Sequence, residues 1–152
     1  MNRAVLLLVK LGLVLALVLC WAAEPKAEEA KAIAEIKKIG GWVFVDEKSP
    51  DKPAISVQLG SSDVTDAGLV NIKGLTTLRW LQLRNTKVTD SGLVHLEGLT
   101  KLQSLDLLNT NVTDAGLVHL KGLTQLQSLD LRSTAVTDAG LDNLRGLLQQ
   151  VD

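Results

Sequence analysis

Side chains that commonly carry catalysis are scarce in this sequence of 152 residues. Its only histidines are His95 and His119, and its one cysteine, Cys20, lies in an apolar N-terminal segment. The sequence contains no GxSxG tract, no HExxH tract and no glycine-rich phosphate loop. Two imidazoles make at most half of a zinc site, because structural zinc takes four ligands. We therefore expect no enzyme, no bound metal and no cofactor.

An aspartate that recurs every 24 residues is the other column of chemical interest. It follows a threonine in four VTDAGL-type tracts: Val64–Leu69, Val88–Leu93, Val112–Leu117 and Val136–Leu141. The threonines suit helix N-caps, and the carboxylates suit the first helical turn, where the helix dipole favours negative charge. The column consists of Asp66, Asp90, Asp114 and Asp138. Because calcium-loop spacing is absent, we expect these aspartates to serve helix starts rather than a cation.

The same period predicts a solenoid in which one structural unit stacks on copies of itself. Each tract leads into an LxxLxL motif, first at Leu78, Leu81 and Leu83. Leucines two residues apart point the same way from a strand, so stacking predicts a parallel sheet backed by short helices. The predicted repeats cover 63–86, 87–110, 111–134 and a partial copy at 135–152.

Two further columns have expected structural roles. A threonine after each strand is expected to satisfy backbone groups of the turning chain. These threonines are Thr86, Thr110 and Thr134, with Ser62 in the same column. A glycine is expected to end each repeat helix. These glycines are Gly74, Gly98, Gly122 and Gly146.

Residues 23–62 are expected to form a linker and an N-terminal cap. The pattern predicts a helix over 27–39, ended by Gly40 and Gly41, and strands over 42–45 and 55–59. Trp42 and Phe44 are exposed together in one strand register and buried under the helix in the other. We expect burial, because large aromatic side chains are mostly buried.

The first 22 residues read as a secretory signal peptide, with a basic start, an apolar stretch and a small-residue exit. An export location then follows: periplasm, cell surface or secreted. An uncleaved membrane anchor and lipidation at Cys20 are the alternatives. Without Arg3 and Lys10 of this segment, the rest of the chain has a net charge of −3, which favours neither nucleic acid nor an anionic membrane as its partner.

The pattern LxxLxLxxTxVTDAGLxxLxGLT resembles the leucine-rich-repeat superfamily, and most closely exported bacterial members built from VTDAGL-type units. The resemblance covers Ile55 to Leu147, and threonine after the strand is as in the ribonuclease-inhibitor-like type. It implies an α/β solenoid, a short horseshoe with parallel strands on the concave face and helices on the convex face. It also implies protein–protein interaction as the usual activity, with no shared catalytic residues.

The outward positions of the strands are the expected ligand contacts. They include Trp80, Gln82, Arg84, Asp106, Leu108, Asp130 and Arg132. Trp80 stands out because its counterparts in the other repeats are serines, and tryptophan with arginine is typical of interface anchors. The alternative is a tryptophan that covers the junction between cap and repeats.

We therefore predict a non-catalytic protein-binding module. A glycan- or cell-wall-binding surface built on Trp80, Gln82, Arg84 and Arg132 is one alternative. A truncated repeat-family fragment without a ligand is another. The strand at 126–131 is expected to be a bare edge, open to an edge-to-edge dimer, unless 148–152 folds over it.

Overall fold

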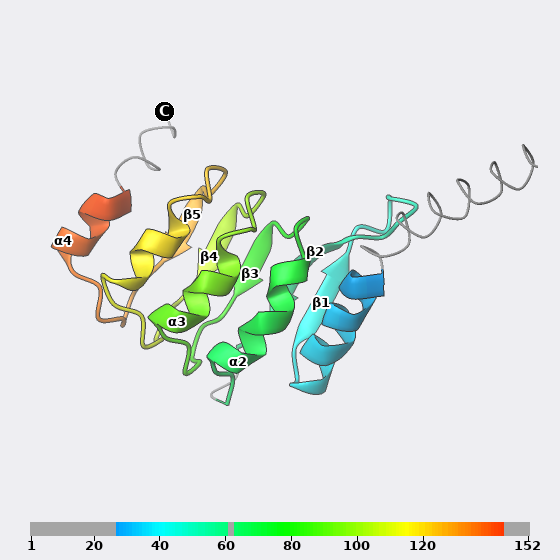
Figure 1. Cartoon of the computed structure of the whole chain (residues 1–152), viewed down its shortest axis with the longest axis horizontal. Helices are drawn as coiled ribbons and strands as arrows, with labels where there is room; N and C mark the ends of the chain where they lie inside the picture. Colours follow the sequence, from blue (N-terminus) through cyan, green and yellow to red (C-terminus); the bar gives the residue numbers. More distant parts are fainter. Residues whose placement is uncertain (1–26, 61–62, 145–152) are drawn as a thin grey trace, which may run out of the picture.

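The computed structural model describes residues 27–60 and 63–144 as one sheet backed by a layer of short helices (Figure 1). The sheet has five strands, which lie side by side in chain order. They are β1 (Trp42–Val45), β2 (Ala54–Gln58), β3 (Trp80–Gln82), β4 (Ser104–Asp106) and β5 (Ser128–Asp130). This arrangement confirms the predicted α/β solenoid with a parallel sheet.

The strands of the repeats pair in a register of 24 residues. β1 runs antiparallel to β2, and each later strand is parallel to the one before it. Ser56 pairs with Trp80, Trp80 with Ser104, and Ser104 with Ser128. Equivalent residues of successive repeats therefore form straight rows across the sheet.

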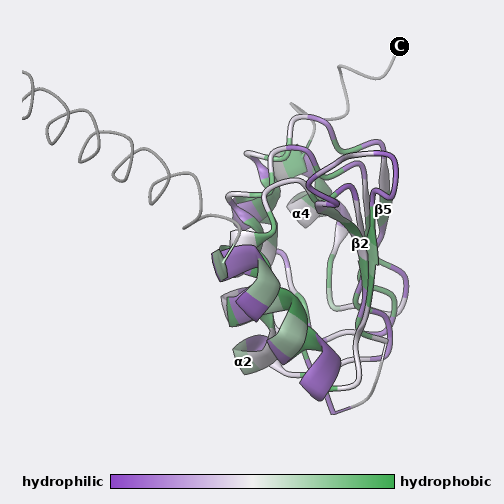
Figure 2. Cartoon of the chain, turned by 90° about the vertical axis from the view of Figure 1, so that its right-hand side faces the viewer, coloured by the Kyte–Doolittle hydropathy of each residue, from purple (hydrophilic) through white to green (hydrophobic). Residues whose placement is uncertain are grey.

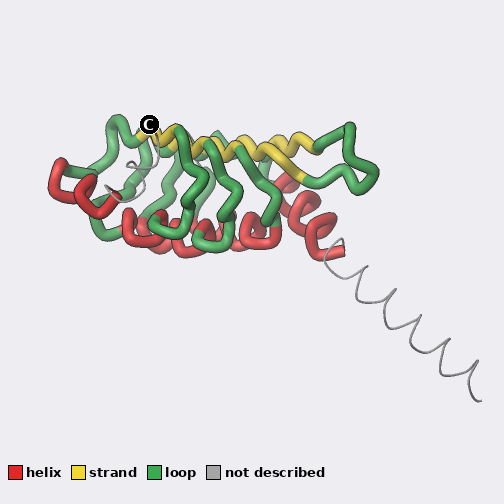
Figure 3. Tube along the Cα trace, turned by 90° about the horizontal axis from the view of Figure 1, so that it is seen from above, coloured by secondary structure: helices red, strands yellow, loops and turns green. Residues whose placement is uncertain are grey.

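Short helices form the opposite layer (Figure 3). The α-helices are α2 (Asp66–Leu69), α3 (Asp90–Leu93) and α4 (Asp138–Leu141). The 3₁₀ segments are η1 (Val70–Gly74), η2 (Val94–Leu96), η3 (Gly116–Leu120) and η4 (Asp142–Leu144). Such single turns are tight enough to return the chain to the sheet within one 24-residue repeat.

Leucines fill the space between the helical layer and the sheet. Figure 2 shows these two layers on opposite sides of the molecule. In the second repeat, Leu93 and Leu96 come from the helical layer and Leu105 from the sheet, and none is more than 1% exposed. The equivalent leucines of the neighbouring repeats contribute to the same core cluster. Because the core runs through all repeats, each repeat buries its apolar face against its neighbours.

The N-terminal cap joins this core. Residues 27–38 are helical, and Ile36 is fully buried. The Glu29 carboxylate accepts a hydrogen bond from the Ala54 backbone N–H at 2.7 Å. Gly40 ends the helix with a φ of 82°, as predicted. A Cβ at Gly41 would lie 2.6 Å from the Ile36 Cγ2 atom, so the helix-to-strand turn requires glycine there.

The threonine column behaves as the sequence predicts. The hydroxyls of Thr86, Thr110 and Thr134 donate to the carbonyls of Leu83, Leu107 and Leu131 at 2.6–2.8 Å. Thr86 and Thr110 are buried, and these bonds close the turn that follows each strand.

The glycines predicted to end the repeat helices lie at those ends: Gly74 is the last residue of η1, and Gly98 and Gly122 follow the C-caps of η2 and η3. Positive φ angles do not occur at Gly74, Gly98 or Gly122. The left-handed residues of the repeats instead follow the strands. They are Asn85, Asn109 and Ser133, with φ of 55–58°. Asparagine tolerates this conformation better than most residues, and its position marks where the chain leaves the sheet.

Several sequence predictions lie outside the described residues. They concern the signal peptide and Cys20, Ser62, Gly146 and the segment 148–152. Within 27–60 and 63–144, no helix is both long and apolar enough to cross a membrane.

Candidate binding face on the sheet

An aspartate–threonine contact between successive repeats holds the strands in register. Asp90 Oδ1 accepts from the Thr113 backbone N–H at 2.8 Å, and Asp90 Oδ2 accepts from the Thr113 hydroxyl at 2.7 Å. Asp66 with Thr89 and Asp114 with Thr137 repeat this geometry at 2.7–2.8 Å. The sequence analysis assigned these carboxylates only to their own helix starts, and that assignment was incomplete.

The threonines of the tracts accordingly serve mainly the preceding repeat. Thr89 and Thr113 also accept weakly, at 3.2–3.3 Å, from the N–H two residues on. Thr65 and Thr137 make no side-chain cap. The hydroxyl and N–H of Thr137 lower the pKa of Asp114, because both donate to its ionised form.

The glycine of each tract makes room for this contact. A Cβ at Gly92 would overlap the Asp66 carboxylate, and one at Gly116 would overlap that of Asp90. Gly140 has the same relation to Asp114. Asp, Thr and Gly of VTDAGL thus form one inter-repeat lock, which aligns the strands and hence the side chains that they present.

The outward side chains of the five strands form a single surface, which we call the strand face. Its polar row pairs Gln58 with Gln82, Gln82 with Asp106 and Asp106 with Asp130. Arg84, Leu108 and Arg132 follow two residues after the last three members of that row. The structure therefore brings together all seven predicted site residues on one face, along three adjacent strands.

Aromatic side chains occupy the N-terminal end of the strand face. Trp42, Phe44 and Trp80 are 70%, 48% and 41% exposed. The predicted burial of Trp42 and Phe44 is wrong. Their neighbour Val43 pairs with Val57, which is fully buried, so alternation along β1 turns both aromatics outward.

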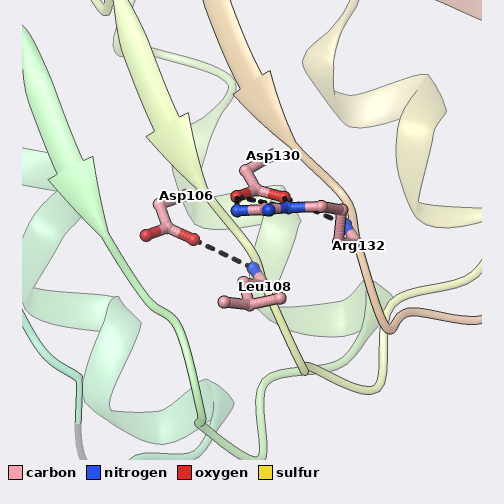
Figure 4. A network of polar contacts seen from close by, with 4 residues as sticks. All are labelled: Asp106, Leu108, Asp130 and Arg132. Atoms are coloured by element: carbon pink, nitrogen blue, oxygen red, sulfur yellow. Dashed lines mark hydrogen bonds and ion pairs between the residues drawn. The ribbon is translucent and has the colours of Figure 1, made fainter.

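Charged side chains occupy the C-terminal end of the strand face (Figure 4). The Arg132 guanidinium donates to both Asp130 oxygens, with Nε–Oδ1 at 2.9 Å and a terminal nitrogen at 2.6 Å from Oδ2. These bonds, with that of the Arg132 N–H, lower the pKa of Asp130 to about 2. The hydrogen bonds and charge of Asp130, with the charge of Asp106, raise the pKa of Arg132.

In each of these repeats, the side chain at the last strand position accepts a hydrogen bond from the residue two positions later. Asp106 Oδ1 accepts from the Leu108 N–H at 3.0 Å, and Asp130 Oδ1 accepts from the Arg132 N–H at 3.1 Å. In the preceding repeat the carboxylate is replaced by Gln82. With its amide oxygen turned toward Arg84, it accepts from the guanidinium at 2.5 and 2.9 Å. Each positive charge is thus held in place by its own strand.

A shallow depression of about 210 Å³ lies in the middle of the strand face. Its rim consists of Ser56, Gln58, Trp80, Gln82, Ser104 and Asp106, and its floor of Val57 and Leu81. Hydroxyl, amide, carboxylate and aromatic groups therefore meet in one open site. These groups can bind a ligand through hydrogen bonds and aromatic contacts.

The histidines lie in the helical layer, away from the strand face. His119 Nδ1 is 2.6 Å from the Glu97 carboxylate of the preceding repeat. His95 occupies the equivalent position one repeat earlier. Across the described part of the chain, no group of three or more His, Cys, Asp or Glu residues is placed to hold a metal ion.

The C-terminal edge of the described sheet is β5. Leu129, Leu131 and Val136 are only half-buried there, whereas the equivalent residues one repeat earlier are 0–1% exposed. A hollow of about 830 Å³ opens beside them. The edge-to-edge dimer stays a prediction.

Comparison with known proteins agrees with this architecture. Residues 98–120 and 122–144 each match the model of the leucine-rich repeat family. These two segments are therefore similar to leucine-rich repeats. No curated protein matches the chain.

Two solved structures resemble the chain in fold. One is an internalin from Listeria monocytogenes strain 4b F2365, with 23% identity and a TM-score of 0.43 over 61% of this chain. The other is the leucine-rich-repeat ectodomain of the receptor kinase SOBIR1 from Arabidopsis thaliana, with 18% identity and a TM-score of 0.45 over 78% of this chain. The chain spans 32% of the internalin and 75% of the ectodomain.

Proposed function

We propose that this protein is a non-catalytic module that binds another protein through the strand face. Leucine-rich-repeat proteins generally act as protein-binding modules. The observation that supports this role here is the collection of Trp80, Arg84 and Arg132 with four further predicted contact residues on one exposed surface. Exposed tryptophan and arginine side chains are enriched among residues that dominate binding energy.

Local geometry supports the same role. Arg132 and Arg84 are already positioned by Asp130 and Gln82, so little side-chain freedom is lost when a partner binds. The lock between repeats fixes the strands beneath them. A rigid, preorganised surface suits recognition of a folded or extended protein segment.

The proposal is tested by crosslinking capture, with the purified protein as bait and mass spectrometry to identify the partner. The test variant is the triple substitution Trp80→Ser, Arg84→Ala and Arg132→Ala. The control is Val94→Ser, which alters an exposed side chain of the helical layer. We expect a partner that the parent and control capture and the triple variant loses. Equal capture by all three would refute binding through the strand face.

We further propose that residues 1–22 direct export and are removed, and that the chain is an exported bacterial repeat protein of the VTDAGL type. The support is the basic, apolar and small-residue order of the leader. N-terminal peptide mapping of the protein from its native cells tests this. A first residue at or near Ala23 is the expected result, and an intact Met1 with Cys20 unmodified contradicts it.

A further inference from the structure

The aromatic residues of the cap and of the first repeat lie in one row. Phe44 pairs with Ser56, and Ser56 pairs with Trp80, so the two aromatics flank one small side chain. Trp42 lies two residues before Phe44 on the same side of β1. We call Trp42, Phe44 and Trp80 the aromatic patch. It extends the strand face beyond the repeats onto the cap.

The groups between the rings of the aromatic patch are uncharged, whereas Lys37, Arg84 and Asp106 lie at its border. Ser56, Gln58 and Gln82 lie between and beside the rings in the strand register. The acid–base pair of Asp130 and Arg132 lies two strands away from β3. Arg84 and Asp106 already have partners in Gln82 and the Leu108 N–H. The rings therefore complement a neutral ligand, because a charged ligand would lose hydration over them without gaining a partner.

We propose that the aromatic patch binds a neutral, proline-rich segment of the partner in the polyproline II conformation. This proposal rests on the protein-binding function and names the chemistry of the bound segment. Proline-rich segments characteristically dock on aromatic-lined surfaces, and they lose little conformational entropy because the helix is preformed.

The spacing of the strands that carry the rings fits this ligand. Phe44 and Trp80 stand on strands separated by two strand spacings, which amounts to about 10 Å. One turn of polyproline II contains three residues and advances about 9 Å. Prolines three residues apart would therefore face Phe44 and Trp80 in turn when the segment crosses the strands.

Hydrogen-bond donors complete the match. A polyproline II segment makes no internal hydrogen bonds, so its carbonyl groups need donors. The indole N–H groups of Trp42 and Trp80 can only donate, and the amide nitrogens of Gln58 and Gln82 also donate. Because the Gln82 oxygen is turned toward Arg84, its NH₂ group points away from the guanidinium.

Isothermal titration calorimetry with decaproline, acetylated and amidated at its ends, tests the proposal. The titrated proteins are the parent, Phe44→Ser, Trp80→Ser and the control Val118→Ser. The next two repeats carry serine at the equivalent positions, Ser104 and Ser128, so we expect Trp80→Ser to retain the fold. Val118 is 44% exposed in the helical layer, similar to both aromatics. Circular dichroism checks each fold.

The expected result is decaproline binding by the parent and the control, weakened about tenfold or more in both aromatic variants. A tenfold loss corresponds to about 1.4 kcal/mol. A glycine–serine decamer should bind none of them. No decaproline binding by the parent, or equal binding by all four proteins, would overturn the inference. So would binding of cellohexaose in place of decaproline, which would make the patch a sugar platform.

The two proposals fail separately. If a partner is captured through the strand face but decaproline does not bind, only the proline-rich inference falls. If decaproline binds but the triple variant still captures its partner, the proposed function falls, and the aromatic patch keeps its affinity for proline-rich segments.

Discussion

Replacing Asp90 with alanine tests the claim that VTDAGL is an inter-repeat lock. Its carboxylate accepts two hydrogen bonds from Thr113, at 2.8 and 2.7 Å. Hydrogen bonds to charged groups contribute about 1.5–3 kcal/mol each. The site is only half-buried, so solvent replaces part of this. We expect a loss of about 2–3 kcal/mol in the free energy of unfolding.

Urea denaturation followed by circular dichroism measures this loss. The control is Asp63→Ala, because the ion pair of Asp63 with Lys87 is exposed and long, at 3.6 Å. Such pairs contribute about 0–1 kcal/mol. In a double-mutant cycle, Asp90→Ala and Thr113→Val should be coupled by at least 0.5 kcal/mol. If Asp90→Ala costs no more than the control, or the pair shows no coupling, the lock does not exist.

Two further predictions concern the glycines and the strand-face carboxylate. Gly116→Ala should destabilise the protein by about 1–3 kcal/mol in the same urea assay, because its Cβ would overlap Asp90. Gly98→Ala, with nothing within 4 Å of its Cβ, should be neutral or stabilise by about 0.4–1 kcal/mol; equal effects would contradict the packing account. The depressed pKa of Asp130, about 2 against 3.8, means that its ionised form stabilises the fold above pH 4 and that this contribution is lost as the pH falls toward 2. NMR titration should find that pKa near 2 in the parent and closer to 3.8 in Arg132→Ala; an unchanged value would contradict the assigned cause.

Sequence periodicity was sufficient for the architecture. Leucines at fixed spacing fixed which side of each strand is buried, so the predicted rows of the strand face agree with the observed register. The prediction of hydroxyl bonds after each strand also held, because a buried threonine at that point has few partners besides the turning backbone.

Contacts between repeats were harder to predict. The Asp90–Thr113 contact joins residues 23 positions apart. A local role at a helix start, as N-cap or in the first turn, already accounted for each of them. The 24-residue period itself held the missing signal, since every Asp stands beside a Gly and a Thr that also recur. The positions of the helix-end glycines were predicted, whereas the left-handed residues that follow the strands, Asn85, Asn109 and Ser133, were not.

The aromatic residues of the cap required the structure. The residue types of β1 fit either strand register. The average burial of aromatic side chains favoured the register in which Trp42 and Phe44 are buried, and that register is wrong. The pairing of Val43 with buried Val57 decides it, and that pairing depends on an antiparallel hairpin that no repeat template contains. The cap therefore adds Trp42 and Phe44 to a face on which the repeats place Trp80 and Leu108 among polar side chains.

The central claim is that the strand face is where this protein meets its partner. Site-specific photocrosslinking in the native cells tests it most directly, with the photoreactive side chain placed at Ser104 on the strand face or at Val94 in the helical layer. Ser104 lies on the rim of the central depression, and Val94 is 44% exposed. We predict an adduct to one defined protein from position 104 and none to that protein from position 94. The same adduct from both positions, or from position 94 alone, would contradict the account.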